Sequence, residues 1–291
     1  MDSLSFPSLP STLSSIPSPA PASPVQGCYI GICPSLFSKL KGRGQALASA
    51  ILSALLPQIP PHVPVCVLVA DWLEGYSLAL FAYNSLSAGQ ARALRDGDQI
   101  VQYLREALAA FPEDERRRVK IVRWQEMVDA DPSYHEETAA LRSYLHSDEG
   151  RQVNQLIEGM AAQFVQARQG LRTLKEGRSL YAEEYLRSEV VPLMRGLRGT
   201  DARHQPCHYQ TLYHPILATK HDDEAMAIGN FQTIFHHLVA SSSLSRYFKP
   251  SDLAFNHDLE LEPRDDGTFA TRTRRWAFTE FPAALPAAGE Q

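Results

Sequence analysis

A cysteine and a serine stand directly after the first strand-like segment of the sequence. Cys33 ends the apolar run CYIGIC, and Ser35 follows it across Pro34. Ligands of open α/β sheets bind at the carboxyl ends of the strands, so a thiol or hydroxyl here is a candidate nucleophile. A buried cysteine and a serine that caps the next helix explain the same residues. The residue types alone leave both interpretations open.

Three side chains recur on one face of a predicted helix. Tyr181, Tyr185 and Glu189 stand four residues apart in SLYAEEYLRSEVVPL, so they share a helical face. A carboxylate beside a phenol can move protons to or from an amine or an acyl group. A solvated glutamate beside two packing tyrosines explains the spacing equally well.

Cations gather in clusters, although the chain has a formal net charge of −5. This charge argues against nucleic-acid binding by the whole surface but permits a local basic patch. Each cluster alone is typical of a solvated surface, whereas their recurrence favours phosphate binding. The clusters are Lys39, Lys41 and Arg43; Arg116, Arg117, Arg118, Lys120 and Arg123; and Arg195, Arg198 and Arg203.

Several common motifs are missing from the sequence. It contains no GxxxxGK[ST] loop, no GxGxxG after the first strand, no HExxH and no CxxC, so we expect no nucleotide cofactor and no metal. No run approaches the ~18 apolar residues of a membrane span. The four cysteines form no close pair, which indicates reduced thiols and a cytoplasmic protein. The pattern does not define the oligomeric state.

Alternating strands and helices would position these residues. Residues 28–33, 63–71 and 119–122 are strand-like, and residues 45–56 and 87–111 are helical. Continuous apolar strands are typical of a parallel sheet that is buried on both faces, so we expect an α/β fold with a parallel sheet flanked by helices. Further helices are expected at 134–170, 177–197 and 222–239, with a strand or loop at 207–217.

The composition divides the chain into three regions. Residues 1–26 are rich in Ser and Pro and lack Lys and Arg, so we expect a disordered leader. Residues 27–250 carry the alternating pattern of one folded domain. Residues 251–291 form a C-terminal extension whose structure the pattern does not define.

Taken in order, these segments resemble the tRNA-dependent cyclodipeptide synthases over residues 29–235. The resemblance is carried by YIGIC, VLVADWLEGYSLALFAYN, ARALRDGDQIVQYL, VKIVRWQEM and YLRSEVVPL. It implies a Rossmann-like fold similar to the catalytic domain of class I aminoacyl-tRNA synthetases, with residues 27–250 as the catalytic domain. It also implies that two aminoacyl-tRNAs are converted into a cyclic dipeptide through a covalent aminoacyl-enzyme, without ATP or another cofactor.

The resemblance assigns roles to individual residues. Gly31 would lie on the floor of the substrate pocket, and Cys33 falls on the nucleophile position. Tyr185 would orient the substrate amine, and Glu189 would bind that amine and transfer protons. The family nucleophile is serine, so the alternative to Cys33 is Ser35. A thiol is a strong nucleophile and its thioester an activated acyl donor, so Cys33 is competent for the same chemistry.

A tyrosine from the segment at 207–217 would support the acyl group. Tyr209, followed by Gln210, fits the spacing, and Tyr213, followed by His214, fits the local pattern. The sequence does not decide between the two.

The Ser/Pro leader and the unusual nucleophile also resemble a divergent fungal branch of the family that favours arginine as one substrate. A cationic substrate needs an acidic pocket, for which we expect Asp71 as the floor and Glu74 as the rim.

The resemblance implies charged tRNAs as partners. We expect Lys39, Lys41 and Arg43, together with Arg116, Arg117, Arg118 and Lys120, to contact tRNA phosphates. Two alternatives remain at this stage. One is a noncatalytic tRNA-binding module of the same fold, and the other is a thiol or serine acyl hydrolase, which would lack its GxSxG motif.

Overall fold

The computed structural model describes residues 25–81, 85–131, 133–166, 197–200, 206–218, 241, 244 and 256–276. The predicted helices at 177–197 and 222–239 lie outside these ranges, except for residue 197. Tyr181, Tyr185, Glu189, Arg195 and Arg203 are therefore also outside the described residues.

In the described part of the chain, the strands form one mixed sheet in the order β3-β2-β1-β5-β6-β7, with β4 paired to β5. Strand β1 is parallel to β2 and β5, β2 is parallel to β3, and β5 is parallel to β6. Strand β4 is antiparallel to β5, and β7 is antiparallel to β6. The α/β fold with a mostly parallel sheet is confirmed. The strands are β1 (Val25–Ile32), β2 (Val65–Val69), β3 (Val119–Arg123), β4 (Leu197–Thr200), β5 (Pro206–Leu217), β6 (Asn256–Pro263) and β7 (Phe269–Trp276).

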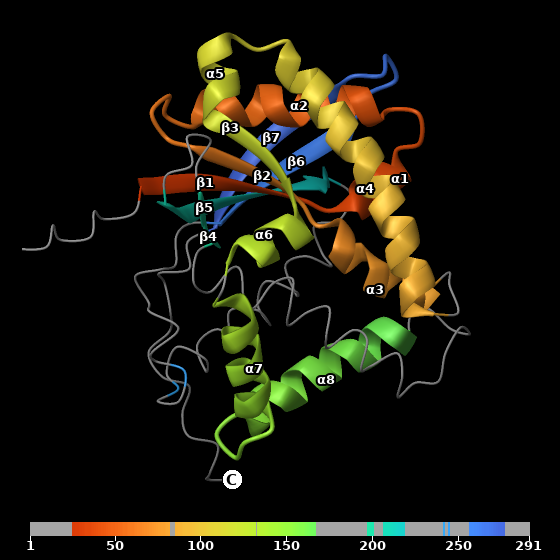
Figure 1. Ribbon diagram of the computed structural model, residues 1–291. Coiled ribbons are helices and arrows are strands. Elements are labelled where there is room, and N and C mark those ends of the chain that lie inside the picture. The colour runs from red at the N-terminus through yellow and green to blue at the C-terminus, as the bar shows by residue number, and fades with distance from the viewer. Residues whose placement is uncertain are drawn as a thin grey trace, which may run out of the picture.

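Helices cover both sides of this sheet (Figure 1). Helices α2 and α4 lie along one side, α6 lies on the other, and α7 and α8 follow beyond α6. The helical elements are α1 (Pro34–Lys39), α2 (Gly44–Leu55), the 3-10 turn η1 (Leu56–Gln58), α3 (Asp71–Phe81), α4 (Leu86–Ala109), α5 (Glu113–Arg118), α6 (Trp124–Ala130), α7 (Tyr134–Leu145) and α8 (Arg151–Gln166).

The main core lies between the sheet and helices α2 and α4. Alternate residues of each strand point to this side because side chains of a strand alternate between its two faces. Tyr103 of α4 also stacks on Phe37 of α1, with ring centroids 6.4 Å apart. The core includes Cys28, Ile30 and Ile32 of β1, Val65, Val67 and Val69 of β2, and Leu47, Ile51, Ile100 and Leu104 of the two helices.

Three features of the fold were not predicted from the sequence. A helix, α3, begins at Asp71 directly after β2. The helix expected over 134–170 is broken between α7 and α8, where Gly150 packs so closely on the Tyr144 carbonyl that a Cβ atom would clash. Residues 256–276 of the C-terminal extension form the β6–β7 hairpin, which joins the sheet through β5.

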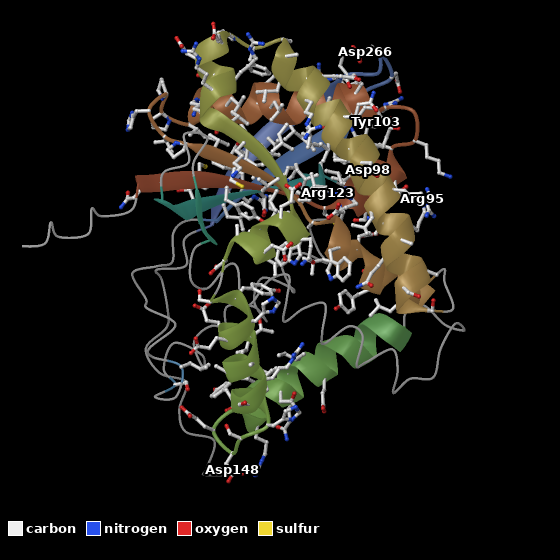
Figure 2. The ribbon with its side chains drawn as sticks, viewed as in Figure 1. Arg95, Asp98, Tyr103, Arg123, Asp148 and Asp266 are labelled. Atoms are coloured by element: carbon white, nitrogen blue, oxygen red, sulfur yellow. The ribbon has the colours of Figure 1, made fainter. Side chains whose placement is uncertain are left out.

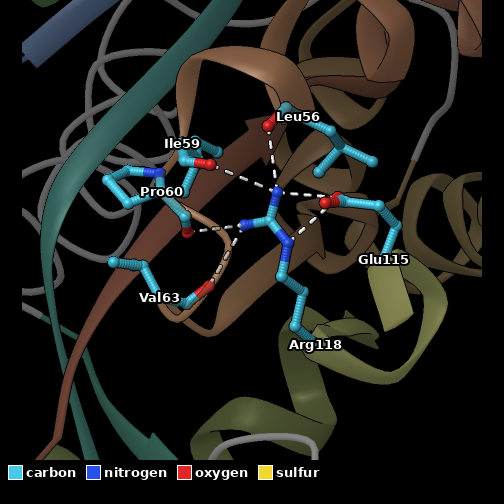
Figure 3. A network of polar contacts seen from close by, with 6 residues as sticks. All are labelled: Leu56, Ile59, Pro60, Val63, Glu115 and Arg118. Atoms are coloured by element: carbon cyan, nitrogen blue, oxygen red, sulfur yellow. Dashed lines mark hydrogen bonds and ion pairs between the residues drawn. The ribbon is translucent and has the colours of Figure 1, made fainter.

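Arg118, which we expected to contact tRNA, is instead held inside the fold (Figure 3). Its guanidinium donates hydrogen bonds to the carbonyl oxygens of Leu56, Ile59, Pro60 and Val63. It also pairs with Glu115 at 2.7 Å, and its side chain is 9% exposed. These carbonyls lie at the carboxyl end of α2 and in the loop before β2, so Arg118 fixes the entry into β2. A side chain with its donors occupied in this way is not available to phosphate.

We predict that Arg118→Met destabilises the fold by about 3 kcal/mol, because the buried carbonyls and Glu115 lose their charged donor. Arg117→Met is the matched control, since Arg117 pairs with Glu113 through largely exposed side chains; its cost should stay within ~0.5 kcal/mol. Urea unfolding of both variants measures the difference. Equal costs would show that Arg118 does not hold the loop before β2.

Candidate active site

The parallel register brings three chain segments to one edge of the sheet. Ile32 of β1 pairs with Val69 of β2, and Val69 pairs with Arg123 of β3. The residues that follow β1 and β2 therefore meet beside the end of β3. This is the carboxyl edge, where α/β sheets place their ligands.

Cys33 lies at this edge, between β1 and α1. Pro34 occupies the first turn of α1, where its fixed φ suits the start of a helix. The Cys33 Sγ atom is 2.9 Å from the Ser35 Oγ atom and 4.0 Å from the Glu74 Oε2 atom. The two candidate nucleophiles are thus in direct contact, and a carboxylate from α3 faces the thiol.

Glu74 reaches Cys33 because α3 starts at Asp71 and places Glu74 about one turn into the helix. Burial raises the pKa of the Glu74 carboxyl to about 7, Lys39 lowers it, and the negative charge of Asp96 adds to the rise. A carboxyl group that titrates near neutral pH can both accept and return a proton under physiological conditions.

Asp71 does not offer a free negative charge to a substrate. It is fully buried, and its Oδ2 atom lies 2.5 Å from the Arg123 guanidinium. Burial raises the pKa of the Asp71 carboxyl, while Arg123 opposes that rise. The expected acidic floor for an arginine side chain is therefore corrected: an arginine of the protein itself already neutralises Asp71.

Arg123 also contacts two parts of α4. Its guanidinium donates to Asp98 Oδ1 at 2.5 Å and to the Leu94 carbonyl at 2.7 Å, and Arg123 and Asp98 lie next to each other in Figure 2. Gly97 permits this approach, because a Cβ atom there would lie 2.3 Å from Asp71 Oδ2. We call Asp71, Arg123, Asp98 and the Leu94 carbonyl the edge network. It joins the start of α3, the end of β3 and the middle of α4 beside the site.

Gly31 and Tyr213, two further candidate residues, lie on opposite faces of the sheet. Gly31 points away from the main core, and a Cβ atom on it would meet Tyr29 and Leu212 at ordinary contact distances. Tyr213 belongs to the main core and stacks on His257 with ring centroids 4.7 Å apart. Burial raises the pKa of Tyr213 to about 12. The structure therefore places Tyr213 on the sheet face opposite to Gly31.

His214 follows Tyr213 in β5, is exposed and thus lies on the other face of that strand. For Tyr209 and Gln210 only the backbone is described. Tyr209 pairs with Gly27, and the register shifts by one residue just after this pair. Tyr185 and Glu189 belong to the segment outside the described residues.

The expected phosphate-binding cations occupy opposite edges of the sheet. Lys39 and Lys41 are exposed at the end of α1 and just after it, and α1 is the helix that follows Cys33. Arg43 follows them and donates to the Arg264 carbonyl at 3.1 Å. By contrast, Arg116 and Arg117 belong to α5, which precedes β3, and three acidic residues in the first turn of α5 balance its arginines. Lys120 is half-buried near the start of β3.

The edge network and the proximity of Asp96 to Glu74 were not predicted from the sequence. The sequence pattern placed Arg123 in the basic cluster of α5 and β3, although it stands at the end of a strand, where a side chain can turn into the site. The segment RDGD of α4 carried a signal, because a glycine inside a helix indicates a close approach by another group. Gly97 is the glycine concerned, and the group that approaches it is the Asp71 side chain. Because Asp71 stands in another part of the sequence, the contact between the two residues was not predictable.

The fold and the site define an α/β protein with a thiol, a hydroxyl and a carboxylate together at the carboxyl edge of its sheet. Among the described residues, no cluster of His, Cys, Asp and Glu could hold a metal ion. Within the same residues, no helix combines the length and the apolar character that crossing a membrane requires.

The structure is similar to solved structures of cyclodipeptide synthases. A cyclodipeptide synthase from Bacillus thermoamylovorans has a TM-score of 0.49 and 13% identity, with 80% of this chain and 86% of the other covered. AlbC, a cyclodipeptide synthase from Streptomyces noursei, has a TM-score of 0.45 and 16% identity, with 72% and 87% covered. The enzyme from Staphylococcus haemolyticus has a TM-score of 0.44 and 13% identity, with 67% and 78% covered. No protein-family model and no curated protein matches the sequence.

We predict that Arg123→Met destabilises the protein by about 3–5 kcal/mol at neutral pH, because it leaves a buried carboxylate unpaired. Without Arg123 the pKa of Asp71 rises further, so stability falls as the pH rises through that pKa, and the deficit shrinks toward pH 4. Urea unfolding between pH 4 and pH 8 measures this dependence. The control is Arg123→Met with Asp71→Asn, which should recover part of the loss; a deficit independent of pH would contradict the buried charge as its cause.

Proposed function

We propose that this chain is a tRNA-dependent aminoacyltransferase that joins two aminoacyl groups into a cyclic dipeptide. One observation carries the proposal. At the position where the resemblance puts the family nucleophile, a thiol stands at the carboxyl edge in contact with a hydroxyl and faces a carboxylate that titrates near neutral pH. The order of the five sequence segments that resemble the family supports the same function.

The proposed reaction passes through a covalent intermediate on Cys33. The thiol attacks the ester carbonyl of the first aminoacyl-tRNA, and the ribose hydroxyl leaves while a thioester forms. The amine of this aminoacyl thioester attacks the ester carbonyl of the second aminoacyl-tRNA, which releases the second tRNA and leaves a dipeptidyl thioester on Cys33. The free amine of the dipeptidyl enzyme then attacks the thioester carbonyl, which closes the diketopiperazine ring and releases the Cys33 thiol. Tyr185 and Glu189 take part in the roles that the resemblance implies, orienting the amine and transferring protons.

The proposal includes arginine as one of the two amino acids. It rests on the resemblance of the Ser/Pro leader and the unusual nucleophile to the arginine-using branch. Since Arg123 already pairs with Asp71, the guanidinium of a substrate needs another acidic partner. The substrates are charged tRNAs, so we propose a cytoplasmic location.

The test is to incubate the pure protein with a full set of charged tRNAs and search for diketopiperazines by mass. We predict a product with wild type that contains arginine, none with Cys33→Ala, and reduced but measurable product with Cys33→Ser, whose hydroxyl restores a weaker nucleophile at the same place. Product from Cys33→Ala would move the nucleophile to Ser35. Tight tRNA binding without any product would indicate a noncatalytic binding module. Release of free amino acids alone would indicate an acyl hydrolase.

We further propose that tRNA phosphates bind over Lys39 and Lys41, because these exposed cations stand at the end of the helix that follows Cys33 and just after it. The competing prediction is that tRNA phosphates bind at the cluster on α5 and β3, which consists of Arg116, Arg117 and Lys120. It lies at the far edge of the sheet and is partly balanced by acids.

We predict that the double substitution Lys39→Glu with Lys41→Glu weakens tRNA binding. The plot of log K against log[salt] should become less steep, by roughly 0.7–0.9 in slope for each phosphate contact that is lost. Arg116→Glu with Arg117→Glu is the matched control and should change the slope less. Binding titrations from 50 to 200 mM salt measure both slopes. A larger loss in the α5 variant would place the docking surface at the opposite edge of the sheet.

A further inference from the structure

We propose that Glu74 is a further catalytic residue, whose carboxylate accepts the thiol proton of Cys33 as the thiol attacks the aminoacyl ester. The proposal rests on the proposed function and deepens it. From the resemblance, we expected Glu74 on the rim of a substrate pocket. In the structure its Oε2 atom instead faces the Cys33 Sγ atom at 4.0 Å.

The proton transfer balances without another reactant. The proton of the S–H bond passes to a Glu74 oxygen, and the sulfur electron pair forms the bond to the acyl carbon. The bond between the acyl carbon and the ribose oxygen breaks, and Glu74 returns the proton to that oxygen. The products are a thioester on Cys33, a free tRNA hydroxyl and an ionised Glu74, ready for the next reaction.

The surroundings of Glu74 suit this role. The charged groups that act on it are Lys39 from α1 and Asp96 from α4, with opposite effects on its pKa. Burial of the carboxyl brings that pKa to about 7, so near neutral pH a large fraction is ionised and able to accept a proton. Ser35, 2.9 Å from Cys33, holds the thiol in the same small cluster.

The charged neighbours of Glu74 make the rate of Cys33 loading depend on pH in a testable way. Loading of Cys33 should increase as the pH rises through the pKa of Glu74, because only the ionised carboxylate accepts a proton. Asp96→Asn removes a negative neighbour, lowers that pKa and shifts the increase to lower pH. Lys39→Met removes a positive neighbour and shifts the increase to higher pH. A residue that only shapes the pocket would not produce these opposite shifts.

The experiment measures thioester formation on Cys33 in single turnovers from labelled aminoacyl-tRNA, between pH 5.5 and 8.5. Glu74→Gln keeps the shape of the side chain but loses its charge. We expect loading to fall on the order of 10²- to 10⁴-fold, with no increase near pH 7 and with unchanged affinity for aminoacyl-tRNA. Loading by Glu74→Gln at the wild-type rate and pH profile would overturn the proposal. A loss explained entirely by weaker affinity would return Glu74 to a substrate-binding role.

Alkylation of Cys33 by iodoacetamide, followed on its own peptide by mass spectrometry, tests the same pair without tRNA. At pH 8 the negative charge of Glu74 opposes a thiolate beside it, so Glu74→Gln should be alkylated faster than the wild type. Faster alkylation combined with slower loading is the expected result. If the wild type forms no thioester, the proposed function fails, and alkylation alone decides: an unchanged rate in Glu74→Gln would overturn the coupling as well.

Discussion

The buried ion pair between Asp71 and Arg123 is the interaction on which the carboxyl edge depends. Asp71 begins α3 and Arg123 ends β3, and the guanidinium also reaches Asp98 and the Leu94 carbonyl on α4. One strand and two helices are therefore fixed relative to each other at one point. Because Glu74 lies one turn beyond Asp71, the same pair sets where its carboxylate meets Cys33. The charge of Asp71 serves the architecture, which leaves Glu74 as the carboxylate that faces the thiol.

The pairing of a thiol with a carboxyl group of pKa about 7 gives the site its chemical character. A hydroxyl nucleophile needs strong assistance to lose its proton, whereas a thiol needs much less, and a carboxylate of modest basicity is sufficient. A cysteine at this position is thus compatible with the proposed acyl transfer. The Ser35 hydroxyl lies 2.9 Å from the sulfur, so the alternative nucleophile belongs to the same cluster.

The parallel core was predictable because β1, β2 and β3 are short apolar runs separated by helical segments. The position of Cys33 at the carboxyl edge was predictable because this residue directly follows β1.

The burial of Arg118 and Asp71 was not predictable. Their residue types indicate charge, but their burial depends on partners more than fifty residues away, Leu56 for Arg118 and Arg123 for Asp71. The strand β6 escaped detection because Asp258 and Glu260 are buried between its apolar residues, so the segment has the composition of a loop. The roles of Tyr185 and Glu189 remain predictions from the resemblance.

The central claim is that Cys33 carries the acyl group. The most direct measurement is peptide mapping of the wild-type protein after a brief incubation with one labelled aminoacyl-tRNA and acid quenching. The account predicts one aminoacyl adduct on the peptide that spans Cys33, bound as a thioester that neutral hydroxylamine cleaves. An adduct localised to Ser35 as an oxygen ester, or cyclic dipeptide formation without any adduct on this peptide, would contradict it.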